Sequence, residues 1–385
     1  MWGTQEQIEV EKAMIAAFQV KHPNITVKLE PFTAADYFEC IEAMFKDGSS
    51  PDVLGVEIGP YAMWIEKGML ENLTPYLQRD NFDWSDFFPE AKDAFTYEGN
   101  IYGLPRDVSG VVLAYNQDLF DAAYIRYPPT SWDSSEWTWD DFLNACRSLT
   151  DASGSQFGFV LSYYEPFVWS NGGDIFDDEK APTACVIDRP EAVEALQWLA
   201  DLRFKHHVVP LPEEQGEQGA LEMFASGKIG MVLIGRWDVP WLRERANFRW
   251  NAALIPAGKA GRVTLRGGTA LGISTQSKHR DAAWEFIRFA TSSEGIAFTA
   301  RGGRTTPARK SVANSDIFLK PGPPTNNQVF LDTIANSRRP AISPVFVECQ
   351  REIAIGLEPL WLGKRSAQEC ADAIKPKVAQ ILRRE

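Results

Sequence analysis

The chain has 385 residues, which is long for one hydrophobic core, so we expect two domains of roughly 150 to 200 residues each. The formal net charge of −13 would repel a phosphate backbone or an anionic membrane surface, so neither nucleic acid nor a membrane surface is an expected partner. No apolar run approaches the ~20 residues that a membrane-spanning helix needs.

Helical and strand patterns alternate from the start of the chain. Apolar residues spaced as on one helix face predict a helix over 10–18, and alternation predicts a strand at 25–29. The same two patterns return at 37–45 and 53–56. This order predicts an α/β fold with a parallel sheet, helices on both faces and ligands at the carboxyl ends of the strands.

A second α/β run begins at Thr138, which forms a capping box with Asp141 at the start of a helix. The elements expected after it are a strand at 157–161, a helix at 191–205, a strand at 229–234, a strand at 270–274 after the Gly-rich stretch 266–268, and a helix at 283–290. Residues 321–324 read as a linker, and two helices close the chain.

The cysteines show no spacing of the kind that metal sites use, so we expect no metal and no cofactor. Four of them fall on apolar helix faces and read as small core residues, whereas the redox state of Cys185 stays open; the five are Cys40, Cys146, Cys185, Cys349 and Cys370.

The familiar catalytic motifs for phosphate loops, zinc proteases and serine hydrolases are absent from the sequence, so we do not expect an enzyme. Glycoside hydrolysis needs only two facing carboxylates, and it stays open as an alternative through Glu57, Asp107, Glu165 and Asp238.

Two aromatic clusters follow expected buried strands. Residues 163–169 place four aromatic rings and Glu165 in one loop, and residues 235–238 place Trp237 between an arginine and an aspartate. Flat rings at strand ends suit the apolar faces of sugars. The alternative is that Trp237 only seals the end of its strand.

Several segments in a fixed order resemble the extracellular solute-binding proteins of ABC importers, in the carbohydrate branch that includes maltodextrin-binding proteins. The segments span nearly the whole chain: 48–53 (GSSPDV), 68–76 (GMLENLTPY), 101–105 (IYGLP), 113–120 (LAYNQDLF), 224–231 (FASGKIGM), 235–237 (GRW) and 282–287 (AAWEFI).

The resemblance implies two α/β domains joined by crossing hinge strands, as in type II periplasmic binding proteins, with a ligand cleft between the domains. The chain is then expected to cross near 106–111, 268–272 and 321–324. The implied domains are 1–108 plus 270–318, and 109–269 plus 319–385.

Ligand contacts in the family come from loops after strands and from the crossings. Transferred position by position, the implied contacts are Gln5, Phe32, Tyr37, Glu57, Arg106, Asp107, Tyr164, Glu165, Phe167, Trp169, Trp237, Asp238, Gly268 and Arg304. Trp237 matches an aromatic platform for a sugar ring, and residues 165–167 match an acidic-Pro-aromatic loop that contacts sugar.

The implied function is capture of a sugar or oligosaccharide by domain closure and delivery to the permease subunits of an ABC transporter, by a monomer. A phosphorylated or acidic polyol is the alternative ligand, suggested by Arg106, Arg236, Arg266 and Arg304. The implied location is periplasmic or extracellular, and a lipid anchor stays open. Only Met1 precedes Trp2 and Gly3, where the family carries a full strand, and no leader is visible, so we expect a clipped first strand and export is implied by the resemblance alone.

Overall fold

A computed structural model describes residues 3, 5–33, 36–132, 134 and 136–384. Met1 and Trp2, and with them the expectation about the first strand, lie outside the described residues. The chain divides into two compact units: unit 1 is Met1–Ser109 with Gly267–Leu319, and unit 2 is Gly110–Arg266 with Lys320–Glu385. The chain passes between the units within β4 (Leu104–Gly110), within β9 (Thr264–Ile273) and after Leu319.

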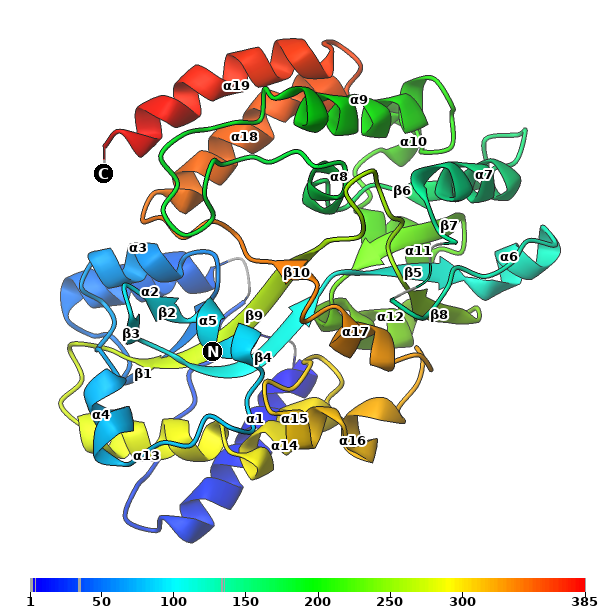
Figure 1. Ribbon diagram of the computed structural model, residues 1–385. Coiled ribbons are helices and arrows are strands. Elements are labelled where there is room, and N and C mark those ends of the chain that lie inside the picture. Colours follow the sequence, from blue (N-terminus) through cyan, green and yellow to red (C-terminus); the bar gives the residue numbers. More distant parts are fainter. Residues whose placement is uncertain (1–2, 4, 34–35, 133, 135, 385) are drawn as a thin grey trace. The chain divides into compact units, whose positions relative to one another are not determined.

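Unit 1 holds a sheet covered by helices on both faces (Figure 1). In this sheet β9 pairs with β1 (Val53–Glu57) in antiparallel fashion and also with β4. The other elements are α1 (Gln5–Lys21), α2 (Tyr37–Asp47), α3 (Tyr61–Glu66), α4 (Thr74–Arg79), α5 (Pro89–Ala94), β2 (Thr96–Tyr97), β3 (Asn100–Ile101), α13 (Arg280–Ala290), α14 (Ser293–Arg301), α15 (Lys310–Ala313) and α16 (Asp316–Leu319).

Side-chain alternation along the strands gives unit 1 a hydrophobic core on each face of its sheet. Leu271 and Ile273 of β9 pack with α1 and α13, around Phe18 and Trp284. Leu54 of β1 points to the opposite face and packs with α2 and α3. A period of two along each strand therefore supplies one apolar surface to each helical layer.

Unit 2 is built on a sheet with the strand order β6-β7-β5-β8. Its first elements are β5 (Val112–Asn116), α6 (Gln117–Ala122), α7 (Trp139–Leu149), β6 (Phe157–Val160), α8 (Glu165–Ser170), α9 (Pro190–Phe204), α10 (Pro212–Gln215) and α11 (Ala220–Ala225). The remaining ones are β7 (Ile229–Ile234), the 3-10 turn η1 (Arg236–Asp238), α12 (Val239–Arg245), β8 (Trp250–Ala253), α17 (Gln328–Asp332), β10 (Ser337–Arg338), α18 (Phe346–Trp361) and α19 (Ala367–Leu382).

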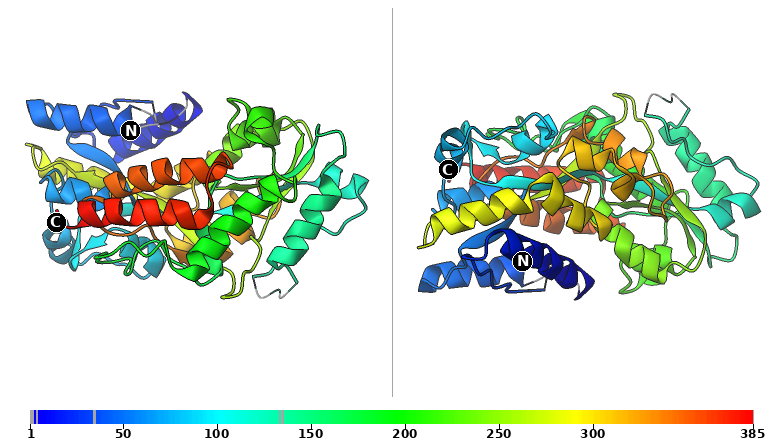
Figure 2. Two further views of the ribbon diagram at one scale, coloured as in Figure 1. Left: turned by 90° about the horizontal axis from the view of Figure 1, so that it is seen from above. Right: turned by 90° about the horizontal axis from the view of Figure 1, so that it is seen from below.

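The C-terminal part of unit 2 is a layer of helices. The helices α18 and α19 pack against each other, and α19 also packs on α9 (Figures 1 and 2). The expected capping box of α19 is present, because Ser366 accepts a hydrogen bond from the backbone of Glu369, and Glu369 accepts one from the backbone of Ser366. The expected capping box of α7, between Thr138 and Asp141, is present as well.

Three expectations about secondary structure need correction. The sheets are mixed rather than parallel: β6 and β7 pair in parallel, but β5 pairs in antiparallel fashion with both β7 and β8. β5 follows β4 almost directly, so no helical crossover imposes a parallel direction on it. The Gly-rich stretch 266–268 does not precede a strand but lies inside β9.

The expected strand at 25–29 is not formed. Ile25, Val27 and Leu29 do alternate, and all three pack on the unit 1 core. The backbone N–H of Val27, however, donates to the side-chain oxygen of Gln19 at 2.9 Å, and the segment has no place in the sheet. Apolar alternation thus predicted the buried face correctly but not a strand ladder.

Candidate functional site

In unit 1, charged residues gather at the ends of β1 and in β4. Glu57 ends β1 and lies opposite Thr269 of β9, and Asp107 of β4 accepts hydrogen bonds from the backbone N–H of Thr269 at 3.1 Å and from its hydroxyl. Burial raises the pKa of Glu57, which Arg304 opposes and Asp107 reinforces. Burial likewise raises the pKa of Asp107.

Helix α1 positions the two arginines of this group. Arg106 donates to Glu11 at 2.5 Å, and Arg304 donates to Gln7 at 2.9 Å. Gln7 and Glu11 are four residues apart, so they share one face of the helix. Arg304 follows the turn at Gly303, which has φ of 74°, a conformation that glycine adopts without strain. We call Glu57, Arg106, Asp107 and Arg304 the unit 1 polar group.

Other predicted residues of unit 1 lie elsewhere or have a structural role. Gln5 is exposed and donates to Glu9 at 3.1 Å. Tyr37 is 0% exposed, and its hydroxyl donates to the carbonyl of Gly55 at 2.9 Å, so we leave it out of the proposed site. Phe32 lies edge-on to Tyr37 at 5.8 Å between ring centroids. Gly268 lies in β9, where a side chain would come within 3.0 Å of the carbonyl oxygen of Asp107.

In unit 2, Trp237 is half-buried in η1, directly after β7. Its indole lies over Gly235, where any β-carbon would collide with the ring. A side-chain hydrogen bond joins it to Tyr163. Asp238 accepts from the backbone N–H of Gly235 at 2.9 Å and so closes the turn. The ring is therefore held by its neighbours on one side of a short turn.

The arginine that flanks Trp237 has a structural role. Arg236 is 1% exposed, donates to the side chain of Asn327 and lies over the ring of Phe330 at 5.1 Å. It holds α17 against η1. Both charged neighbours of Trp237 therefore have structural roles: Asp238 closes the turn, and Arg236 packs α17 against η1.

The acidic-aromatic segment forms α8. Glu165 is half-buried at its first turn, and burial raises its pKa. Tyr164 precedes it, with its ring half-buried 6.4 Å from that of Trp361. Phe167 is buried in the core among Phe142 and Phe159, so we leave it out of the proposed site.

Trp169 lines a pocket of about 190 Å³ that lies wholly within unit 2. The pocket is formed by α8, the loop 174–179, residues 338–341 at the end of β10 and beyond, and residues of β9 and α18. Its charged lining residues are Glu165, Asp174, Glu179, Arg338 and Arg339. Two predicted ligand residues, Glu165 and Trp169, therefore lie beside residues of β9, β10 and α18, which are distant from them in sequence. Trp169 itself is 7% exposed.

A larger hollow of about 550 Å³ lies in unit 1, between α4, α5 and the β2–β3 hairpin. None of the predicted ligand residues lines it. We therefore place no site there, because neither the polar group nor the aromatic clusters come near its lining.

Sequence reasoning missed several of these residues. Gln7 and Glu11 carried a usable signal in their four-residue spacing, which places both on one face of α1, where they bind the arginines of the unit 1 polar group. Arg338 and Arg339 form a basic pair at the end of the short strand β10. Asp174 had no signal beyond its position five residues after Trp169, and it is the fold that brings it to Arg338.

Neither a metal site nor a membrane helix is found in the part of the chain that the structure describes. No group of three or more His, Cys, Asp or Glu side chains there is placed to hold a metal ion. No helix among those residues is both long enough and apolar enough to cross a membrane.

Residues 3–297 match the family of bacterial extracellular solute-binding proteins. The chain belongs to this family. A binding protein of Brucella abortus is 24% identical over 96% of this chain and 89% of its own length. The arabinooligosaccharide-binding protein of Bacillus subtilis is 26% identical over 76% of this chain and 68% of its own length.

Among solved structures, an ABC substrate-binding protein of Listeria monocytogenes in complex with cycloalternan superposes with a TM-score of 0.88 and 26% identity, covering 97% of this chain and 95% of that one. This solute-binding protein therefore has the type II periplasmic-binding fold of two α/β domains that the sequence predicted, and the expected family is confirmed.

Proposed function

We propose that this solute-binding protein captures a sugar or short oligosaccharide outside the cytoplasmic membrane and delivers it, unchanged, to the permease of an ABC importer. The observation that carries the proposal is the setting of Trp237, a half-buried indole seated on Gly235 at the end of β7. Relatives whose names specify an arabinooligosaccharide or cycloalternan support a carbohydrate ligand.

We propose ligand contacts in each of the two units. As the two domains we propose the ranges predicted from the sequence. One is 1–108 plus 270–318, and the other is 109–269 plus 319–385. The unit 1 polar group supplies hydrogen bonds to hydroxyls, and Trp237, Tyr164, Glu165, Trp169 and Asp238 supply stacking and orientation from unit 2. A hydroxyl both donates and accepts, so carboxylates and guanidinium groups can fix its direction by charge-assisted bonds. Closure follows if the bound sugar interacts better with the closed state than with the open one.

An anionic ligand is less well supported, because all four arginines that suggested it already have partners. Arg106 pairs with Glu11, and Arg304 bonds Gln7. Arg236 is held by Asn327, and Arg266 is buried and donates to the carbonyl of Ser337 at 2.7 Å. A glycoside hydrolase would release reducing ends from an oligosaccharide, and we expect none.

The test begins with a screen by calorimetry against maltotriose, arabinotriose and galactobiose, in which at least one sugar should bind and raise the melting temperature. Trp237→Ala should then weaken binding of that sugar at least tenfold, since an aromatic platform contributes about 1 kcal/mol beyond the area it buries. Trp132→Ala, a change of the same size in unit 2 away from η1, is the matched control. Binding by Trp237→Ala within twofold of the parent, with the fold intact, would remove the platform from the proposal.

A further inference from the structure

The pocket beside Trp169 is the size of one sugar ring rather than of a whole oligosaccharide. Its volume of about 190 Å³ corresponds to about six water molecules at roughly 30 Å³ each. Pockets that enclose a complete drug-sized ligand usually begin near 300 Å³. A single ring of a bound sugar is therefore the natural occupant.

Arg338 is fixed in the wall of this pocket from three sides. It donates to Oδ2 of Asp174 at 2.8 Å and lies 3.6 Å from Oε2 of Glu179. Its guanidinium lies over the ring of Trp169, 5.0 Å from the centroid. Asp174 uses its other oxygen to accept from the indole N–H of Trp169 at 3.1 Å. The carboxylate of Asp174 thus holds both the indole of Trp169 and the guanidinium of Arg338 in place.

The charges of the pocket oppose an anionic ligand. Three carboxylates, those of Glu165, Asp174 and Glu179, stand against the guanidinium groups of Arg338 and Arg339. The side chain of Arg338 is about one-third exposed, so it retains N–H groups that can reach a ligand. Its positive charge, however, is already compensated by two carboxylates. A neutral hydroxyl can accept from this guanidinium at little electrostatic cost, whereas a carboxylate on the ligand would add a fourth negative charge to the three of the pocket.

We propose that the carboxylates of this pocket, Asp174 and Glu179 above all, outweigh the charge of Arg338 and make the pocket select a neutral sugar ring over the same ring carrying a carboxylate. The inference rests on the proposed function and adds to it the charge class of the solute and the residues that impose it. Asp174 and Glu179 act on the ligand by their negative charge, and Arg338 offsets part of that charge.

The experiment measures a ratio of affinities. The probes are maltotriose, arabinotriose and galactobiose, each paired with its analogue in which the terminal primary alcohol is oxidised to a carboxylate. For the pair whose neutral member binds, the dissociation constants of both members are measured by calorimetry on the full chain. In Asp174→Asn, which keeps the shape and the acceptor for Trp169, the preference for the neutral member should fall about tenfold, as expected for removing one charge near the ligand at intermediate screening.

Two further variants are needed. One tests the direction of the charge effect, and the other is the control. Arg338→Met removes the positive charge, so the preference for the neutral member should rise. Asp188→Asn removes a carboxylate of similar exposure that pairs with Lys375 in the same unit, outside the pocket lining, and it should leave the ratio unchanged. Melting curves of all variants exclude loss of fold as the cause.

The outcomes separate the two proposals. If the parent protein binds none of the neutral sugars, the proposed function fails and this inference fails with it. If a neutral sugar binds but Asp174→Asn and Asp188→Asn give the same ratio, the inference alone is overturned. A lower preference in Asp174→Asn together with a higher one in Arg338→Met supports it.

Discussion

At the scale of single residues, the position of Trp237 depends on the absence of a side chain at Gly235. The indole occupies the space in which a β-carbon would lie, although the backbone of Gly235, with φ of −93°, is open to any residue. Packing against the ring, and not backbone conformation, therefore requires glycine here.

Gly235→Ala should for this reason displace the indole and weaken sugar binding several-fold, with a cost of about 1–3 kcal/mol in stability from overpacking. Gly219→Ala is the control, because its β-carbon would meet no atom closer than 4.0 Å. Calorimetry with the sugar from the screen and thermal melts measure the two effects. Equal affinities in Gly235→Ala and the parent would show that the ring can shift without consequence for the ligand.

Buried charged residues explain why the site was harder to predict from the sequence than the fold. The sequence correctly placed Trp237 and Glu165 after buried strands, because strand ends can be read from apolar runs. It could not show that Arg236 and Arg266 are buried, since a charged residue in a loop reads as exposed until its partner is known. Asn327 and Ser337 lie 91 and 71 residues away from them along the chain.

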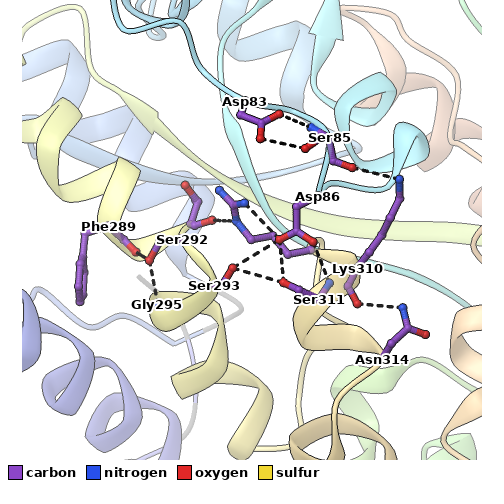
Figure 3. A network of polar contacts seen from close by, with 12 residues as sticks. Asp83, Ser85, Asp86, Phe289, Ser292, Ser293, Gly295, Lys310, Ser311 and Asn314 are labelled. Atoms are coloured by element: carbon purple, nitrogen blue, oxygen red, sulfur yellow. Dashed lines mark hydrogen bonds and ion pairs between the residues drawn. The ribbon is translucent and has the colours of Figure 1, made fainter.

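At the scale of elements, one carboxylate joins three segments of unit 1. Asp86 accepts from the backbone N–H and the hydroxyl of Ser311, at 2.8 and 2.7 Å, and from Arg309 at 3.3 Å (Figure 3). Ser293, the first residue of α14, donates to it at 3.4 Å. The loop before α5 is thereby tied to α14 and α15.

Stability at this junction should depend on pH. Burial acts to raise the pKa of Asp86, but the hydrogen bonds from Ser311 and Arg309 outweigh it, and the pKa lies below its ordinary value. The unfolded chain then binds the proton more readily than the folded one. The stabilisation is therefore complete above about pH 5 and is lost as the pH falls below the ordinary value of about 3.9 and through the folded pKa.

Asp86→Asn should lower the free energy of unfolding by about 1–2 kcal/mol at pH 7, because it removes charge-assisted bonds. The difference from the parent should shrink as the pH approaches 3. Urea unfolding at a series of pH values measures it, with the exposed Asp140→Asn as control. A difference that is the same at pH 3 and pH 7 would contradict the role assigned to the charge.

Element types were predictable wherever the local signals agreed with the packing. The capping boxes at Thr138 and Ser366 and the apolar face of α7 fixed two helices from sequence alone. The segment 25–29 and the direction of β5 were not predictable, because strand pairing is decided by partners far along the chain.

At the scale of the whole molecule, the protein carries a formal net charge of −13, whereas we propose that its solute is neutral. A neutral ligand releases no counterions and feels no long-range field, so its affinity should change less than twofold between 50 and 500 mM NaCl. Calorimetry with the sugar from the screen measures this, and its oxidised analogue serves as the comparison. A steep decline for the neutral sugar would contradict this expectation.

The passages of the chain through β4 and β9 also bear on how the protein is made. Val53 of β1 pairs with Ile273 of β9, so β1 cannot form this pairing until more than two hundred later residues have been synthesised. Unit 2 in turn lacks α18 and α19 until residues 346–382 have been synthesised. Each unit therefore stays incomplete until segments far along the chain have been synthesised, and neither can reach its final fold before then.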